Sequence, residues 1–77
     1  MVRIKLIELT EDFARYKFFP EKSEDCGIVA LNRINGERII EMQPAGYGNQ
    51  YAAHSLRRIE EYRKTGDYIA EDTIAWY

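Results

Sequence analysis

The sequence predicts an α+β fold, in which an antiparallel β-meander of four strands carries one amphipathic helix on one face and a short C-terminal fifth strand joins the sheet. Three features favour this ββββαβ order. Apolar and charged residues alternate before Pro20, an Asn-Gly pair separates two apolar runs, and apolar residues recur at a helical period between Asn49 and Gly66. We expect residues 1–77 to form a single domain, because a chain of this length builds one small core.

The first two strands are predicted at Val2–Leu9 and Phe13–Phe19, where apolar residues alternate with arginine and lysine. A three-residue loop, Thr10–Asp12, keeps the apolar and charged faces separate, whereas a two-residue loop would mix them. The resulting register pairs Leu6 with Tyr16, Lys5 with Lys17 and Leu9 with Phe13. The charged segment Glu21–Cys26 that follows is predicted to be a solvated loop.

The third and fourth strands are predicted at Gly27–Arg33 and Glu37–Gln43. Between them lie Asn35 and Gly36, and Asn-Gly between two apolar runs is a strong signal for a two-residue hairpin turn. That turn would pair Leu31 with Ile40 and Val29 with Met42 on the buried face.

The helix is predicted over Asn49–Gly66, with Ala52, Leu56 and Ile59 on the side that faces the core. The asparagine at its start is expected to cap the first turn through its side chain, and the glycine at its end to adopt the left-handed conformation. After a connecting segment, Thr73–Tyr77 has strand character and is expected to join the sheet.

The composition of the chain limits the kinds of partner, metal and cofactor that we expect. The formal net charge is −2, which favours neither nucleic acid nor an anionic membrane as a partner. No apolar run is long enough to span a membrane and no secretory signal is visible, so we expect a cytoplasmic protein. Cys26 is the only cysteine and His54 the only histidine, which excludes an internal disulfide and a zinc-type ligand set. We therefore expect neither a metal nor a cofactor.

No paired catalytic groups can be placed together from the sequence, so we do not expect an enzyme. His54 lies nearly opposite the apolar stripe of the helix and is expected to be solvated. The turn Gly46–Asn49 precedes the helix, where free amides can bind an anion, but it lacks the third glycine of a dinucleotide fingerprint. A plain turn with a helix cap is the simpler interpretation.

One helix cannot cover both faces of a four- or five-stranded sheet, which directs attention to the face away from the predicted core. Six apolar residues are expected there, interleaved with charge as in many protein interfaces. They are Ile7, Leu9, Phe13, Phe19, Ile28 and Ile39. These residues either bind a protein or pack beneath loops. We favour binding, and so expect a small non-enzymatic protein-interaction or regulatory module with a protein partner or a homodimer.

The alternative function uses a basic patch on the same face. Arg3, Lys5, Arg15 and Lys17 are expected there, beside Phe13 and Phe19. Basic groups next to exposed aromatic rings can hold single-stranded nucleic acid through phosphate contacts and base stacking. Opposed lysines weaken a strand pair, however, and glutamates of the fourth strand would neutralise the patch if that strand lies near it. The alternative is therefore a weak single-stranded nucleic-acid binder.

Overall fold

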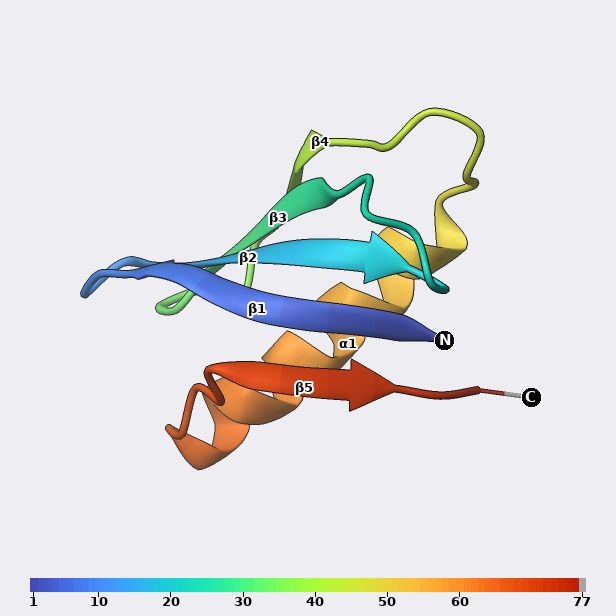
Figure 1. Ribbon diagram of the computed structural model, residues 1–77. Helices are drawn as coiled ribbons and strands as arrows, with labels where there is room; N and C mark the ends of the chain where they lie inside the picture. Colours follow the sequence, from blue (N-terminus) through green and yellow to red (C-terminus); the bar gives the residue numbers. More distant parts are fainter. Residues whose placement is uncertain (77) are drawn as a thin grey trace.

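The alternating segments form five strands and the helical repeat forms one helix in a computed structural model of the protein, which describes residues 1–76 (Figure 1). The elements are β1 (Val2–Leu9), β2 (Phe13–Pro20), β3 (Gly27–Asn32), β4 (Arg38–Met42), α1 (Gln50–Thr65) and β5 (Glu71–Ile74). Neighbouring strands are antiparallel and follow the order β4-β3-β2-β1-β5. The predicted ββββαβ fold is therefore confirmed.

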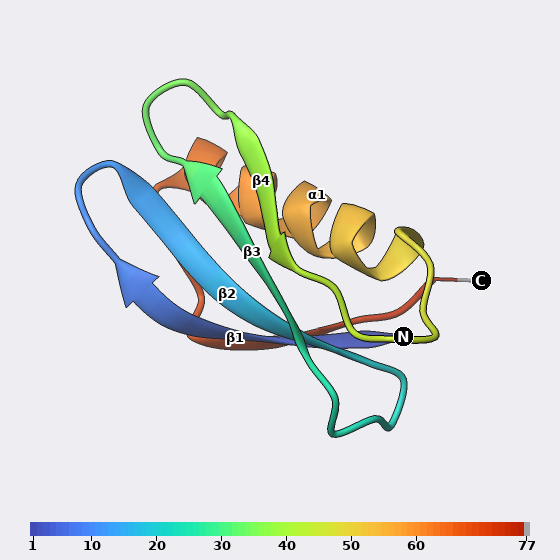
Figure 2. The ribbon, with the colours of Figure 1, turned by 90° about the horizontal axis from the view of Figure 1, so that it is seen from above.

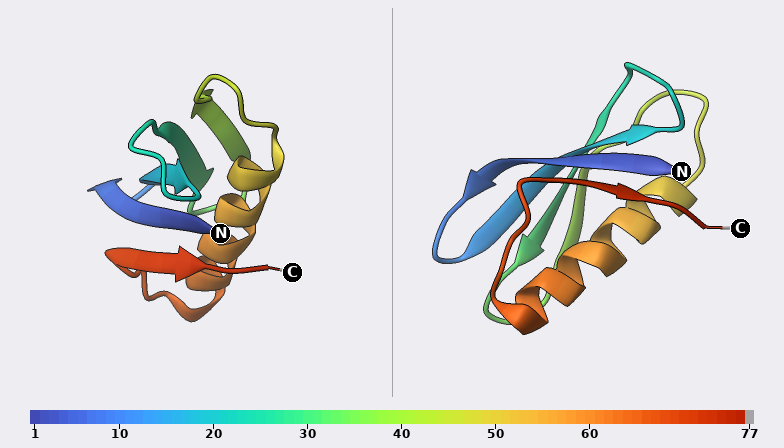
Figure 3. Two further views of the ribbon diagram at one scale, coloured as in Figure 1. Left: turned by 45° about the vertical axis from the view of Figure 1, so that its right-hand side comes forward. Right: turned by 60° about the horizontal axis from the view of Figure 1, so that its bottom comes forward.

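The sheet and α1 form two layers. Helix α1 crosses one face of the sheet, which we call the inner face, and no other element of residues 1–76 covers the opposite, outer face (Figures 2 and 3). Because side chains alternate between the two faces of a strand, the inner face receives every second residue. The buried strand residues on it are Val2, Ile4, Ala14, Tyr16, Phe18, Val29, Leu31 and Ile74.

Helix α1 closes this core with the predicted stripe. Ala52, Leu56 and Ile59 are buried against the sheet, as the helical spacing indicated, and Tyr51 and Tyr62 are buried beside them. The helix ends as predicted, because Gly66 has a φ of 81° and its amide donates to the carbonyl of Tyr62 at 2.7 Å.

The predicted cap at the start of α1 is wrong. Asn49 makes no side-chain cap, because its backbone is already helical, with φ −72° and ψ −11°, and a capping side chain needs an extended residue. Its side-chain oxygen instead accepts a hydrogen bond from the side chain of Gln43. The asparagine therefore ties the beginning of the loop, directly after β4, to the start of the helix.

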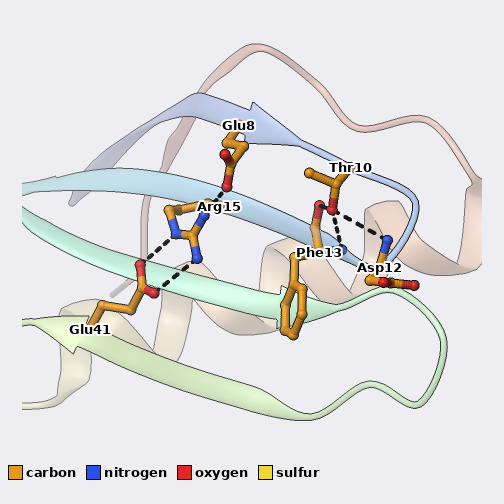
Figure 4. A network of polar contacts seen from close by, with 6 residues as sticks. All are labelled: Glu8, Thr10, Asp12, Phe13, Arg15 and Glu41. Atoms are coloured by element: carbon orange, nitrogen blue, oxygen red, sulfur yellow. Dashed lines mark hydrogen bonds and ion pairs between the residues drawn. The ribbon is translucent and has the colours of Figure 1, made fainter.

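The hairpin between β1 and β2 is partly as predicted. Lys5 does lie opposite Lys17, and Leu6 opposite Tyr16, but Leu9 pairs with Ala14 rather than Phe13. The hydroxyl of Thr10 accepts hydrogen bonds from two backbone amides of the turn and tightens it (Figure 4). The amide of Thr10 donates to the carbonyl of Phe13 at 2.8 Å, so the turn is one residue shorter than the predicted three-residue loop. A β-bulge at Ile7 takes up the extra residue of β1.

The register predicted for β3 and β4 is also wrong, by two residues. Leu31 pairs with Arg38 and Val29 with Ile40. The side chain of Asn32 accepts hydrogen bonds from the amides of Ile34 and Asn35, at 2.8 and 3.1 Å, and thereby holds a longer loop, residues 33–37, between β3 and β4. A shift of two residues keeps each side chain of Arg38, Ile39 and Ile40 on its expected face. The prediction that Ile40 and Met42 are buried is wrong, however, because both are exposed and Met42 lies opposite Ile28.

A contact from the helix explains why the longer loop forms in place of the predicted two-residue turn. The guanidinium of Arg63 donates to the carbonyls of Arg33 and Ile34, at 3.1 and 2.8 Å, so the end of α1 holds the loop directly. Gly36 lies against the same guanidinium and has a φ of 79°, which only glycine adopts easily. A two-residue turn would place these carbonyls elsewhere and lose both contacts.

The C-terminal segment was predicted as a strand over Thr73–Tyr77, but β5 begins and ends earlier, at Glu71–Ile74, and Tyr77 lies outside the described residues. Trp76 follows the strand and packs on α1, where its ring stacks on His54 at a centroid distance of 4.0 Å. The expectation that His54 is solvated is therefore wrong, since this ring half-covers it.

Asp72 joins β5 to the helix. It lies opposite Ile4, on the inner face, and its carboxylate accepts hydrogen bonds from Tyr62 and from Arg58, the latter at 2.7 Å. Partial burial raises the pKa of Asp72, but these hydrogen bonds outweigh it, so the pKa lies below its ordinary value. Burial and the hydrogen bond to Asp72 raise the pKa of Tyr62.

Replacing Asp72 with asparagine should lower the free energy of unfolding at pH 7 by about 1 to 2 kcal/mol, because it removes charge-assisted hydrogen bonds that are partly screened by water. A carboxylate whose pKa is lowered in the folded state stabilises it fully above the unfolded pKa of about 4, and that contribution disappears as the pH falls through the lower folded pKa. Urea unfolding should therefore show the difference between wild type and Asp72→Asn shrinking below about pH 5. A difference that is constant down to pH 2 would contradict this role.

Candidate functional site: the outer sheet face

The outer face is ordered in rows, because residues directly opposite each other on antiparallel strands point to the same side. Strand pairing defines three rows that cross β1. They are Phe19–Arg3–Thr73, Met42–Ile28–Lys17–Lys5–Glu71 and Ile39–Ala30–Arg15–Glu8. Phe13, opposite Asn32, begins the next row.

Four of the six apolar residues predicted for an interface lie on this face. Phe13, Phe19, Ile28 and Ile39 are all half-buried, and the last three share their rows with charged residues. The other two are displaced by the bulge in β1. Leu9 points to the inner side, because it lies opposite Ala14, and Ile7 is the exposed extra residue of the bulge itself.

The predicted basic patch separates into one cation that is paired with carboxylates and three cations that are less compensated. Arg15 is held between two carboxylates: its Nε and Nη2 donate to Glu41 at 2.6 and 3.0 Å, and its Nη1 donates to Glu8 (Figure 4). The hydrogen bond from Arg15 lowers the pKa of Glu41, and the hydrogen bond to Glu41 raises the pKa of Arg15. Ala30 of β3, the strand between Arg15 on β2 and Glu41 on β4, is fully buried. Arg15 is therefore neutralised, as expected if the fourth strand lay nearby.

The other three cations of the patch are less compensated. The Arg3 guanidinium lies 5.0 Å from the centre of the Phe19 ring and donates to the carbonyl of Ser23 at 2.9 Å. Lys5 forms one long ion pair, at 3.8 Å, with Glu71. Lys17 forms no ion pair with any residue that the structure describes.

A groove of about 630 Å³ lies over this part of the face. Its lining comes from β1, the end of β2 and β5: Arg3, Ile4, Lys5, Phe19, Glu71, Asp72 and Thr73. Ile4 and Asp72 direct their side chains toward α1, so their backbone forms part of the floor. The side chains available to a ligand are thus two cations, one aromatic ring, one hydroxyl and one carboxylate.

The remaining sequence candidates contribute nothing to this face. Among residues 1–76 no group of three or more His, Cys, Asp and Glu side chains is placed to hold a metal ion. In the turn before α1, Gly46 has a φ of 83° and the side chain of Asn49 is bound to Gln43. A plain turn stays the prediction there, with anion binding as its alternative. Within the described chain no helix has the length and apolar character needed to cross a membrane.

Comparison with protein-family models, with curated proteins and with solved structures found no match to this chain. Function is therefore inferred from the outer face alone. Glu8, Glu71 and Thr73 were absent from the predicted site, and the alternation of side chains could have added them only once the bulge and the place of β5 beside β1 were known.

Proposed function

We propose that this chain is a small, non-enzymatic protein-interaction module of the cytoplasm, which binds a partner protein through its outer sheet face. One observation carries the proposal. The single helix covers the inner face only, so Phe13, Phe19, Ile28 and Ile39 stand partly exposed on the other side, between charges. Apolar and aromatic residues mixed with polar groups are typical of protein interfaces.

The charges on this face favour an acidic partner. Arg15 is already paired with Glu8 and Glu41, whereas Arg3 and Lys17 have no carboxylate partner among residues 1–76. A partner surface that combines apolar groups with acidic side chains would match both parts of the face, and opposite charges speed and orient association.

Nucleic acid fits less well. The affinity for a polyanion grows with the number of phosphates that basic groups contact. Here the run of free cations is short, and a strand crossing it would meet Glu71 on one side and the carboxylates of Glu8 and Glu41 on the other. The net charge of −2 adds a further repulsion.

A different protein also fits better than a second copy paired through a sheet edge. Open edges are commonly blocked by charge, shortness or a bulge. Strand β5 has four residues, including Glu71 and Asp72, while β4 carries Arg38 and Glu41 and is irregular where it pairs with Ile28 and Val29. Both edges thus show these blocking features.

Selection from a displayed random-peptide library tests the proposal. We expect the enriched peptides to combine acidic with aromatic or aliphatic residues, and to lose at least tenfold in affinity for the outer-face double variant Ile28→Ser, Ile39→Ser. The matched control is Ile34→Ser, Ile69→Ser, which makes the same chemical change at exposed positions outside the strands. Thermal unfolding of both variants checks that the fold is retained.

Three outcomes would overturn the proposal. Peptides whose affinity falls in the control variant rather than the outer-face variant would place binding elsewhere. Salt-dependent binding of a single-stranded oligothymidylate or oligouridylate that the outer-face variant weakens would make nucleic acid the ligand. A sedimentation profile that shows a dimer, dissolved by the outer-face substitutions, would make a second copy the partner.

A further inference from the structure

We infer that the groove over β1, β2 and β5 is an oxyanion site, in which Arg3, Lys5 and the hydroxyl of Thr73, together with Lys17 next to the groove and opposite Lys5, receive one carboxylate or phosphate group carried by a side chain of the bound protein. The inference rests on the proposed function for the identity of the carrier, and it names the chemical group that anchors it. The site itself is built from three observations.

The first observation is the pair Lys5 and Lys17. The two lysines lie directly opposite each other on neighbouring strands, where like charges oppose strand pairing. Lys17 has no ion-pair partner in the described chain, and the Lys5 contact with Glu71 joins two side chains that are 60% and 73% exposed. An ion pair that exposed contributes little, so a bound anion could replace it at small cost.

The second observation is that Arg3 is held in place. Its guanidinium lies over the Phe19 ring and uses one Nη to bind the carbonyl of Ser23. A guanidinium carries five N–H donors and no acceptor, so the greater part of its hydrogen-bonding capacity is left for a ligand. Because both contacts restrict its motion, binding an oxyanion would order this side chain little further.

The third observation is the size and boundary of the site. Thr73 lies directly across from Arg3, and Lys5 lies two residues from Arg3 along β1, so the donors come from two adjacent rows of the sheet. The carboxylate of Glu71 limits the second row, and the Arg15 pairs with Glu8 and Glu41 occupy the third. This boundary suits a single oxyanion beside an aromatic ring and opposes a longer chain of phosphates.

Titration followed by amide NMR tests the site with small probes. Phenyl phosphate and benzoate supply the two oxyanions next to an aromatic ring, and benzyl alcohol is the uncharged control. We expect both anions to shift the amides of Arg3, Lys17 and Thr73 with saturation in the millimolar range, as is usual for ligands of this size. Tighter binding of phenyl phosphate would assign a phosphorylated side chain to the partner, and equal binding an acidic one.

The matched variants are Lys17→Glu and Lys64→Glu, which change the net charge equally, on the outer face and at the end of α1. Lys17→Glu should weaken both anions at least tenfold while the melting temperature stays equal or rises, because the new carboxylate would face Lys5. Lys64→Glu should leave both affinities unchanged. Equal affinities in the two variants, the absence of shifts, or tighter binding of oligothymidylate than of phenyl phosphate would overturn the inference.

The Ile28→Ser, Ile39→Ser variant separates this inference from the proposed function. It removes apolar contacts from the outer face but leaves the groove lining intact, so it should lose the selected peptides and keep phenyl phosphate. Phenyl phosphate binding without any selected peptide would defeat the proposed function and leave the oxyanion site standing. Selected peptides that bind Lys17→Glu as tightly as wild type would defeat the oxyanion site alone.

Discussion

Replacing Leu56 with alanine should lower the free energy of unfolding by about 2 to 5 kcal/mol, the range found when a buried leucine is truncated. Leu56 is 4% exposed and lies between Ala52 and Ile59 in the stripe that packs on the sheet. The single core of a domain this small supplies only about 3 to 5 kcal/mol of net stability. We therefore expect a large fraction of the variant to be unfolded at 37 °C.

The same substitution at Leu9 is the control. Leu9 is 46% exposed at the end of β1, so Leu9→Ala removes the same atoms from a site that is already about half exposed to water. Its effect should be less than half as large in urea unfolding of the two variants. Equal losses in Leu56→Ala and Leu9→Ala would contradict the packing of α1 on the inner face.

Replacing Gly27 with alanine should cost about 1 to 3 kcal/mol, as expected for overpacking a filled core. Gly27 is buried opposite Phe18, and a Cβ there would overlap the Phe18 ring and lie 2.6 Å from the carbonyl oxygen of Met42. The ring is fully buried and the carbonyl is backbone, so neither moves freely. The need for glycine at this position comes from space, since its φ is not positive.

Gly48→Ala provides the comparison of opposite sign. Gly48 is exposed, has no heavy atom within 4 Å of a Cβ, and has no positive φ. Alanine there restricts the unfolded chain and should stabilise the protein by about 0.4 to 1 kcal/mol. Thermal unfolding should show the melting temperature falling for Gly27→Ala and rising for Gly48→Ala. A fall of the same size in both would mean that the space around Gly27 is not what matters.

Patterns along the chain were sufficient to predict the strands and the helix of this fold. Alternation located β1 and β2, and the helical period located α1 and its buried stripe, because each pattern follows from the geometry of a single element. The first half of the β1–β2 register followed too, since only one pairing places Leu6 and Tyr16 on one face and Lys5 and Lys17 on the other.

The β3–β4 loop and the surroundings of His54 depend instead on contacts between segments that are distant in the sequence. The Asn-Gly pair predicts a two-residue turn by itself, but hydrogen bonds to the side chain of Asn32 and from Arg63 of the helix select the longer loop. His54 is partly covered by Trp76, which is far from it in the sequence. A single-element pattern contains no information about either contact.

The candidate site shows the same division. The alternation of side chains along each strand was enough to assign Phe13, Phe19 and Ile28 to the outer face. The alternation failed for Leu9, because the bulge at Ile7 reverses the faces to which the following residues of β1 point. The division of the basic patch depended on strand order, since Glu41 reaches Arg15 only because β4 lies beside β3.

Methyl NMR of the isoleucines, during titration with a selected acidic peptide, tests most directly whether the outer face is the binding surface. Isoleucines sample every part of the molecule: Ile28 and Ile39 lie on the outer face, Ile59 and Ile74 in the core, and Ile34 and Ile69 outside the strands. If the outer face binds the partner, the methyl signals of Ile28 and Ile39 will shift with the peptide while those of the other four stay in place. Shifts confined to Ile34 or Ile69, with Ile28 and Ile39 unchanged, would contradict it.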